Sequence, residues 1–271
     1  MKIGCFIAVV SVFLGLAAFS PAEARSHFMG KKGDRGEQEQ GKSDAGLEPR
    51  MRIRPSGLVA VFPAEAACPD IASPFGSSTR YDGSRRPSDR YGGLHGGIDI
   101  SLEEGTPLRA IAAGQVISAG TGGLARGIYL WLQHSPQETG LPFWVYSKYQ
   151  HLRDIPELKA GETVTAGQIV GLSGKTGTVG RHYGPAGYPH LHLTTFAVSS
   201  DRYEVRGSSV VAPMSRIFDP VTLYVKGLRD VDEIERLSGD QKNVPVPYVA
   251  EDGSVHPAGA PVVWPVACRR R

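Results

Sequence analysis

Short apolar runs, separated by glycine, proline and small polar residues, form the main pattern between about residues 55 and 227. The runs are rich in β-branched and aromatic residues, and they cover residues 108–117, 128–133, 143–149, 168–172 and 191–198. None keeps a helical period over a dozen residues, and regular spacing of such runs favours strands. The pattern predicts an all-β domain, an antiparallel β-sheet sandwich or open barrel with a groove. A short helix is expected only over 230–237.

The two ends of the chain have other patterns. Residues 1–24 combine one lysine, an apolar run over 3–19 and the terminal Ala22-Glu23-Ala24, which predicts a secretory signal peptide. The apolar run is short for a membrane span and Pro21 follows it, so we expect no stable membrane insertion after cleavage; an uncleaved anchor is the alternative. Residues 25–54 are polar and predict a disordered linker, while the Pro-rich residues 228–271 predict an irregular extension of the 55–227 domain.

The net charge limits the kinds of partner that the protein can bind, and the cysteine content bears on the cellular compartment in which it folds. A net charge of +3 over 271 residues, without a block of like charges, indicates no nucleic-acid partner. Two cysteines, Cys68 and Cys268, remain after the predicted signal peptide. In an oxidising compartment they could form a disulfide, and two free thiols are the alternative.

Six of the eight histidines fall within the predicted domain, and two of them lie in the stretch PHLHL over 189–193. Alternate residues of a strand face the same way, roughly 6.6 Å apart, so His190 and His192 would share one face with leucines packed behind them. His95 and Asp99 would be roughly 13 Å apart on an extended strand. The Gly-Gly step between them allows a bend that brings the two side chains together.

Two imidazoles and one carboxylate suit a catalytic zinc site, which keeps one position open for water. The remaining histidine of the pair and His151 would then serve as base or as oxyanion stabiliser. Structural alternatives remain open at this point. His190 and His192 could lie on a solvated strand face, Asp99 could bond a local turn and leave His95 exposed, and His151 could bond backbone at a strand end.

Three motifs in order, HGGID at 95–99, YQHL at 149–152 and HLH at 190–192, resemble those of LytM/lysostaphin-type zinc metallopeptidases, which cleave peptidoglycan cross-links. The similarity extends over about residues 55–227 and includes the stretches 72–76, 105–120, 158–177 and 218–220. It implies a fold of the duplicated hybrid motif type and one zinc ion per chain. The implied zinc ligands are His95, Asp99 and His192, and the implied catalytic pair is His151 and His190.

The same resemblance implies further roles. Tyr91, Tyr149 and Tyr188 become candidates for substrate binding, and His134 becomes a structural residue. The chain departs from the family pattern in an insert at 178–189, which carries His182, and in a lengthened loop at 135–142. The insert is expected to shape the rim of the groove, and the two departures together leave the peptide specificity open.

The implied function is that of a secreted zinc metalloendopeptidase, periplasmic or extracellular, with peptidoglycan peptides as its partners. The main alternative is a non-catalytic LytM-like module that binds and activates a cell-wall amidase. Such modules typically lack metal ligands, whereas all five motif positions are filled here, so the sequence favours an enzyme. The stretch GETVTAGQIVG (161–171) also resembles biotinyl or lipoyl carriers, but its hairpin tip lacks the lysine that a carrier needs.

Overall fold

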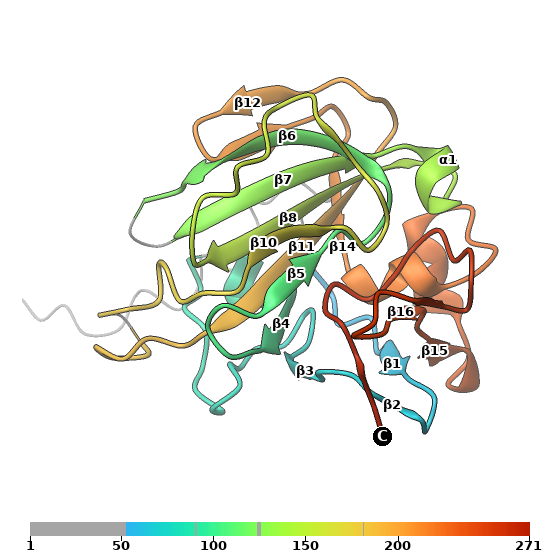
Figure 1. The fold of residues 1–271 in the computed structure, drawn as a ribbon, viewed down its shortest axis with the longest axis horizontal. Coiled ribbons are helices and arrows are strands. Elements are labelled where there is room, and N and C mark those ends of the chain that lie inside the picture. Colours follow the sequence, from blue (N-terminus) through green and yellow to red (C-terminus); the bar gives the residue numbers. More distant parts are fainter. Residues whose placement is uncertain (1–52, 90, 124–125, 181) are drawn as a thin grey trace, which may run out of the picture. The chain divides into compact units, whose positions relative to one another are not determined.

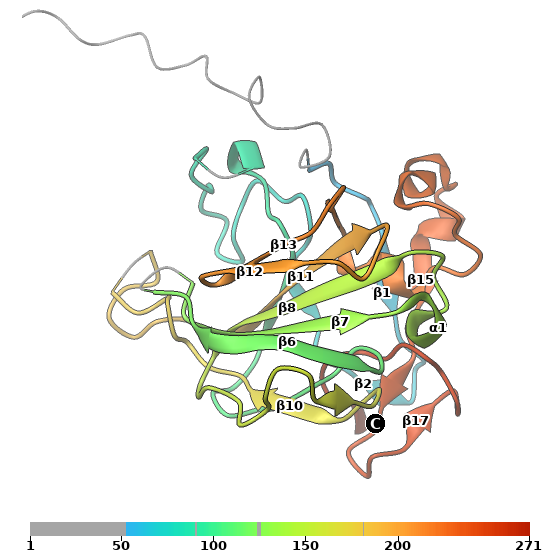
Figure 2. The same cartoon turned by 90° about the horizontal axis from the view of Figure 1, so that it is seen from above.

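The computed structural model describes residues 53–89, 91–123, 126–180 and 182–271 (Figures 1 and 2). The predicted signal peptide and all but the last two residues of the predicted linker lie outside the described residues. Among the described residues, no helix is both long and apolar enough to cross a membrane.

An eight-stranded antiparallel sheet forms the centre of the domain (Figure 1). Its strands lie in the order β3 (Ile71–Ser73), β4 (Ile98–Ser101), β11 (His190–Val198), β8 (Trp144–Leu152), β7 (Ile128–His134), β6 (Gly114–Thr121) and β9 (Thr163–Val164). The eighth strand, β14 (Arg216–Phe218), pairs with β11 at residues 195–197, beyond the end of β4. The predicted all-β antiparallel class is therefore confirmed.

Four of the five apolar runs are single strands close to their predicted bounds, and the run 108–117 is not. Its residues divide between β5 (Pro107–Arg109), which pairs with β10 (Ile169–Leu172), and β6 in the large sheet. The backbone between them leaves both ladders. Ala110 N–H donates to Gln168 O, and Ile111 N–H donates to the hydroxyl of Tyr149.

The hydrophobic core lies between one face of the large sheet and the layer that contains β5 and β10. Leu191 and Leu193 of β11 enter it from the sheet and are almost fully buried. Tyr149 of β8 enters from the same face, and its hydroxyl donates to Arg109 O. This face is the one predicted for the leucines of PHLHL.

The tail belongs to the same core, although its composition predicts an irregular extension. Val263 N–H donates to Ile111 O, and Trp264 is fully buried. Short two-stranded ladders hold the tail in place: β15 (Asn243–Pro245) on β1 (Val59–Val61), β16 (Tyr248–Val249) on β17 (Val255–His256), and β18 (Arg269–Arg270) on β2 (Ala66–Ala67).

Helical segments are short. The only α-helix of the described residues is α1 (Pro136–Thr139), which lies in the predicted lengthened loop and begins with a capping box between Ser135 and Glu138. The others are 3-10 turns: η2 (Tyr91–Gly93), η3 (Pro220–Tyr224), η4 (Val231–Arg236) and η5 (Asp240–Lys242). The helix expected over 230–237 corresponds to η4.

A hairpin of β12 (Glu204–Arg206) and β13 (Ser209–Val211) packs on the other face of the sheet (Figure 2). Val210 and Ala212 from this hairpin and its continuation contact a small cluster of buried sheet residues, which are Ile117, Tyr129, Trp131, Tyr146 and Val198. The sheet therefore carries apolar contacts on both faces.

Cys68 and Cys268 form a disulfide across 200 residues of sequence, with Cα atoms 4.3 Å apart. The structure thus selects one of the two alternatives that the sequence leaves open. Because the bond joins the segment after β2 to the tail just before β18, it closes a loop around nearly the whole described domain.

Removal of the bond by the double substitution Cys68→Ala/Cys268→Ala should lower the free energy of unfolding by about 2–5 kcal/mol, because cross-linking restricts the unfolded chain. Urea unfolding followed by tryptophan fluorescence measures the change. Treatment of the unsubstituted protein with reductant should lower stability to a similar extent, and reductant should not affect the double variant. An unchanged midpoint, or two titratable thiols in the untreated protein, would contradict the expectation.

Candidate metal centre and catalytic cleft

The pairing of β4 with β11 places Asp99 directly opposite His192. Directly opposed residues of an antiparallel pair point to the same face, so carboxylate and imidazole meet on the face opposite the core. The two neighbours of His192 on β11, Leu191 and Leu193, are buried on the core side. Strand alternation therefore separates metal ligands from core residues.

The two glycines of HGGID allow His95 to approach these residues. A Cβ at Gly97 would lie 2.3 Å from Leu193 O, and a Cβ at Gly96 would lie 2.6 Å from the ring of Tyr91. Both contacts are too short for any side chain. The chain therefore turns tightly before β4 and brings His95 Nε2 to 3.1 Å from Asp99 Oδ1.

Three ligand atoms converge on one point: His95 Nε2, Asp99 Oδ1 and His192 Nδ1. His192 Nδ1 lies 2.8 Å from Asp99 Oδ1 and 3.1 Å from His95 Nε2. Tetrahedral zinc with bonds of about 2.0–2.1 Å holds its ligand atoms about 3.3 Å apart, so the triangle has nearly the right size. The donor set of two nitrogens and one oxygen also fits zinc.

Polar contacts on the far side of the His95 and His192 rings orient the nitrogens that face Asp99. His95 Nδ1–H donates to Pro74 O at 3.0 Å, which leaves Nε2 with its lone pair toward Asp99. His192 Nε2 lies 3.0 Å from Thr194 Oγ1, which holds the ring so that Nδ1 faces Asp99. Such outer bonds orient imidazole ligands and set their tautomers.

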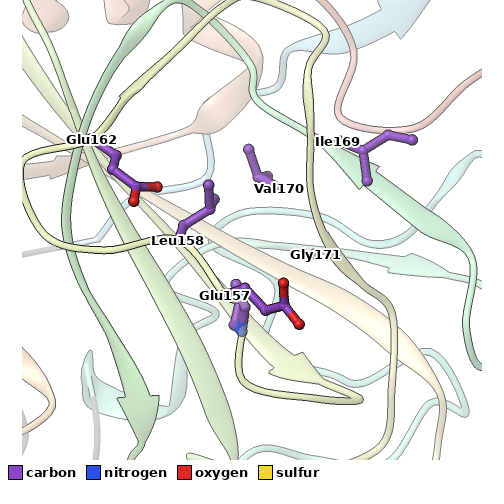
Figure 3. A pocket seen from close by; sticks show the side chains of 7 residues that line it. Glu157, Leu158, Glu162, Ile169, Val170 and Gly171 are labelled. Carbon is purple, nitrogen blue, oxygen red and sulfur yellow. The ribbon is translucent and has the colours of Figure 1, made fainter.

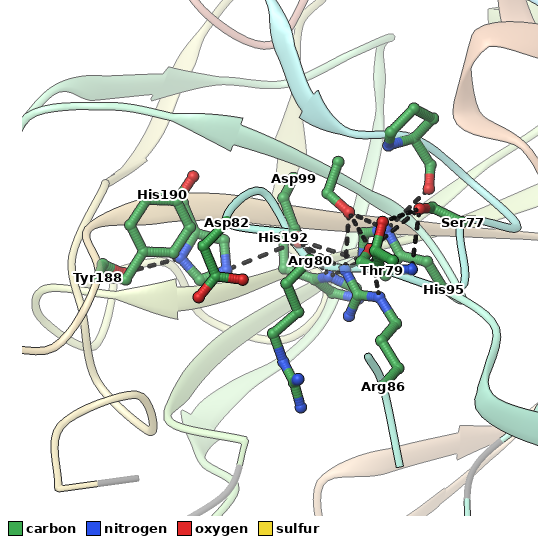
Figure 4. A network of polar contacts seen from close by, with 12 residues as sticks. Ser77, Thr79, Arg80, Asp82, Arg86, His95, Asp99, Tyr188, His190 and His192 are labelled. Carbon is green, nitrogen blue, oxygen red and sulfur yellow. Dashed lines mark hydrogen bonds and ion pairs between the residues drawn. The ribbon is translucent and has the colours of Figure 1, made fainter. Parts of the chain in front are cut away.

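Arg86 contacts the second oxygen of the carboxylate, a contact without a sequence signal (Figure 4). Its Nη2 donates to Asp99 Oδ2 at 3.2 Å and to Ser73 Oγ at 2.8 Å. Burial opposes ionisation of Asp99, but the neighbouring His95 and His192 outweigh it and hold the pKa of Asp99 well below its usual value. Oδ1 is thereby left facing the two imidazoles.

His151 reaches the same side of the sheet through a break in the strand pattern. Gln150 pairs with Tyr129, and Leu152 pairs with Ile128, so His151 is an extra residue in β8 with a φ of 63°. Such bulges re-aim a side chain and recur beside active sites. His151 Nδ1–H donates to Thr176 O at 2.7 Å, and its ring centre lies 4.6 Å from that of His190.

His190 completes a group of four imidazoles. Its Nδ1–H donates to Tyr188 O at 2.8 Å, and its Nε2 lies 3.6 Å from Asp99 Oδ1. Burial lowers the pKa of His190, and burial together with the neighbouring His190 and His192 lowers the pKa of His151 to about 3. Both rings are therefore neutral, with Nε2 able to accept a proton.

The predicted tyrosines lie in three different environments. Tyr91 lines the cleft beside His95. Tyr188 stacks on the ring of His190 with ring centres 4.5 Å apart, and its hydroxyl bonds to Ser101. The expectation for Tyr149 is wrong, because this residue precedes the bulge and points into the core, where it is fully buried.

The insert at 178–189 forms part of the rim. Tyr188 stacks on Tyr81, and His182 Nε2 lies 2.9 Å from Asp82 Oδ2, so the insert contacts the loop that precedes HGGID. Tyr183, also in the insert, lines the cleft. His134 lies elsewhere and is fully buried, with both ring nitrogens hydrogen-bonded to Ala113 O and Ser147 Oγ, as expected of a structural residue.

The four imidazoles lie in a cleft of about 980 Å³ that continues over the sheet toward Trp131 and Phe196. A smaller hollow of about 370 Å³ lies near β10 and is lined by Pro156, Leu158 and Ile169 among others (Figure 3). Its lining contains none of the candidate ligands or catalytic histidines. The large cleft is therefore the candidate active site.

Residues 93–203 match the description "Peptidase family M23". This range contains the three candidate metal ligands together with His151 and His190. This part of the chain is similar to the M23 peptidases. Lysostaphin of Staphylococcus simulans is 36% identical over 102 residues, and the alignment covers 38% of this chain and 18% of lysostaphin. The glycyl-glycine endopeptidase ALE-1 of Staphylococcus capitis is 37% identical over 103 residues, with coverage of 38% and 24%. An uncharacterised metalloprotease of Haemophilus influenzae is 30% identical over 141 residues, with coverage of 51% and 26%.

The chain thus matches about a fifth to a quarter of the length of these relatives. Among solved structures, the catalytic domain of lysostaphin from Staphylococcus simulans is 29% identical. That alignment covers 52% of this chain and 86% of the other, with a TM-score of 0.35.

Substitution of Gly97 by alanine should disrupt the candidate metal site, because the new Cβ would collide with Leu193 O in the adjacent strand. We expect the free energy of unfolding to fall by about 1–3 kcal/mol, as for other overpacked sites, and zinc affinity to fall with it. Thermal unfolding and competition with a chromophoric chelator measure the two effects. Gly239→Ala is the matched control, since Gly239 is exposed and a Cβ there meets no atom within 4 Å. Wild-type stability and zinc affinity in Gly97→Ala would contradict this account.

Proposed function

We propose that this protein is a secreted, zinc-dependent metalloendopeptidase that hydrolyses peptide stems or cross-links of peptidoglycan. One observation carries the proposal: two imidazole nitrogens and a carboxylate oxygen converge beside two further neutral imidazoles, in an open cleft of the region that is similar to the M23 peptidases. The similarity to lysostaphin and to a glycyl-glycine endopeptidase supports cell-wall peptides as substrates.

His95, Asp99 and His192 would hold one zinc ion. Bound zinc acts as a Lewis acid and lowers the pKa of a coordinated water toward neutrality. The protein contributes ligand geometry through the carbonyl of Pro74 and the hydroxyl of Thr194, which hold the two imidazole ligands in place.

His151 and His190 would manage the protons of the reaction. Each donates Nδ1–H to a main-chain carbonyl, and each therefore presents an unprotonated Nε2. Hydrolysis breaks the amide C–N bond, adds the water oxygen to the carbonyl carbon and moves one proton to the leaving amine. A neutral imidazole can take that proton from water and return it to the amine, and a positioned group of this kind contributes about 10²–10⁴-fold in rate. The imidazole that has taken the proton is a cation until it gives the proton to the amine, and during that interval it would stabilise the developing oxyanion.

Export is the part of the proposal that rests on the sequence at residues 1–24 and on the disulfide. A disulfide between Cys68 and Cys268 is typical of proteins that fold outside the cytosol. We therefore place the enzyme in the periplasm or outside the cell, with no stable membrane insertion after cleavage of the signal.

Two substitutions separate metal binding from proton transfer. His95→Ala in the mature chain should abolish both zinc binding and muropeptide release from purified sacculi. His190→Ala should retain zinc at one ion per chain and reduce muropeptide release by about 10²–10⁴-fold. Elemental analysis and chromatography of the released muropeptides measure the two quantities. His256→Ala, which removes an imidazole far along the sequence and outside the cleft lining, is the control.

The outcomes distinguish the proposal from its alternative. Zinc-free protein that leaves sacculi intact but binds and stimulates a cell-wall amidase would overturn the enzyme assignment. It would instead support the activating module that the fold also permits.

A further inference from the structure

The floor of the cleft continues the pleated face that carries the metal ligands. His192 and Thr194 are alternate residues of β11 and point to the same face. They lie opposite Gln150 and Lys148 of β8, respectively. Lys148 is in turn opposite Trp131 of β7. All of these residues line the cleft. Lys148 is thus the diagonal neighbour of His192, and such neighbours have Cβ atoms roughly 7–8 Å apart.

Lys148 places a cation in this floor. The side chain is largely buried, with only 6% of the residue's surface exposed. Its Nζ lies 5.3 Å from the ring centre of Tyr129 and 5.2 Å from that of Trp131. Two aromatic faces therefore hold the ammonium group, an arrangement that is stronger where water is excluded. An anion that enters the cleft meets an ammonium group whose position is already fixed.

The charges around the cleft favour an acidic ligand. Among the described residues that line it, the basic ones outnumber the acidic ones; they are Arg80, Arg86, Arg126 and Lys148 against Asp89 and Asp99. Asp99 is a predicted metal ligand and is already paired with Arg86. A cleft lined by charges of one sign concentrates substrates of the opposite sign.

The surroundings of Lys148 also fit the stem that carries such a charge. Trp131 and Phe196 line the same part of the floor, with ring centres 5.6 Å apart. Trp131 is mostly covered by the β12–β13 hairpin, so the partly exposed ring of Phe196 is the one that a substrate stem would meet. Aliphatic carbons pack well on aromatic rings of this kind, whereas a glycine bridge has no side chain that could use them. The chemistry beyond the metal therefore favours a residue with an aliphatic stem and a carboxylate.

We propose that Lys148 is a specificity-determining residue that binds a substrate carboxylate one or two residues from the scissile bond. An extended peptide advances about 3.3 Å per residue, so two residues span nearly the distance from His192 to Lys148. The inference rests on the proposed peptidase function and names its substrate class: acidic stem peptides are preferred over neutral bridges. The carboxylate can belong to a side chain or to the end of a peptide, and both present the same group to Lys148.

The test compares substrates that differ only in this charge. One preparation of sacculi is divided, and in one half the free carboxyl groups are converted to amides with carbodiimide and ammonia. The zinc-loaded mature protein should release muropeptides from the untreated half about tenfold to a hundredfold faster, the usual effect of a hydrogen bond to a charged group. Two synthetic stem peptides, one amidated only at its side chain and one only at its terminus, identify which carboxylate is bound.

Lys148→Met should lose this preference while it still cleaves the amidated substrate, because Lys148 lies outside the zinc ligands and the catalytic pair. Lys148→Gln is the second variant, and the ratio of kcat/KM between the two substrates is compared within each protein, so a loss of folded protein cancels. Lys159→Met removes an exposed lysine outside the cleft and should keep the wild-type ratio.

Each remaining outcome counts against a different statement. Equal cleavage of free and amidated substrate by the unsubstituted protein overturns the carboxylate preference and leaves the peptidase function standing. A preference that persists in both Lys148 variants overturns the role of Lys148. Failure of the zinc-loaded protein to cleave either substrate overturns the peptidase function and this inference together.

Discussion

The register between β4 and β11 is the constraint on which the site depends. It sets Asp99 opposite His192, and the same pairing buries Ile98 and Ile100 on β4 together with the leucines of PHLHL on β11. A slip by one residue would turn every side chain of one strand to the other face. Two histidines would enter the core and two leucines would face the cleft. The hydrophobic effect, through these buried neighbours, therefore holds the candidate ligands in place.

Four imidazoles around one buried carboxylate form an unusual electrostatic environment. Three of the rings donate Nδ1–H outward to a main-chain carbonyl, Pro74 O, Thr176 O or Tyr188 O, and His192 Nε2 lies beside Thr194 Oγ1. The second nitrogen of each of these three rings therefore carries a lone pair, and with the ionised carboxylate it makes the group electronegative. Burial lowers the pKa values of His151, His190 and His192 and so favours the uncharged form of these three rings. Such a site fits a divalent cation far better than a further hydrogen-bond donor.

The alternation of residues along a strand predicts much of this arrangement. It fails for residues at which the strand is irregular, such as the bulge at His151. Alternation correctly sends Leu191 and Leu193 to the core, and the glycines of HGGID correctly indicate a bend. Alternation would also place His151 on the core face with Tyr149, and only the bulge, which leaves no mark in the sequence, reverses it. The wrong expectation for Tyr149 has this cause.

Contacts between distant parts of the chain could not be predicted from the sequence, for a second reason. The path of the Pro-rich tail decides whether Trp264 is buried, and the path of the loop before HGGID decides whether Arg86 reaches Asp99. Neither path is encoded in a local period. The motifs fixed by strand geometry were therefore predictable, while their partners from loops and the tail were not.

The proposed catalytic centre and the proposed recognition residue share one pleated face of the sheet, and this limits how each can change. The separation between His192 and Lys148 is set by strand spacing, so it is the same in any conformation that keeps the sheet. The rim differs, because it is built from the insert and the loop before HGGID, joined by the stack of Tyr81 on Tyr188 and the pair of Asp82 with His182. These contacts involve side chains alone and lie partly in solvent, where an ion pair stabilises weakly. Substitutions there can alter which peptides enter the cleft without moving a ligand, whereas a change in the floor alters recognition at a fixed distance from the metal.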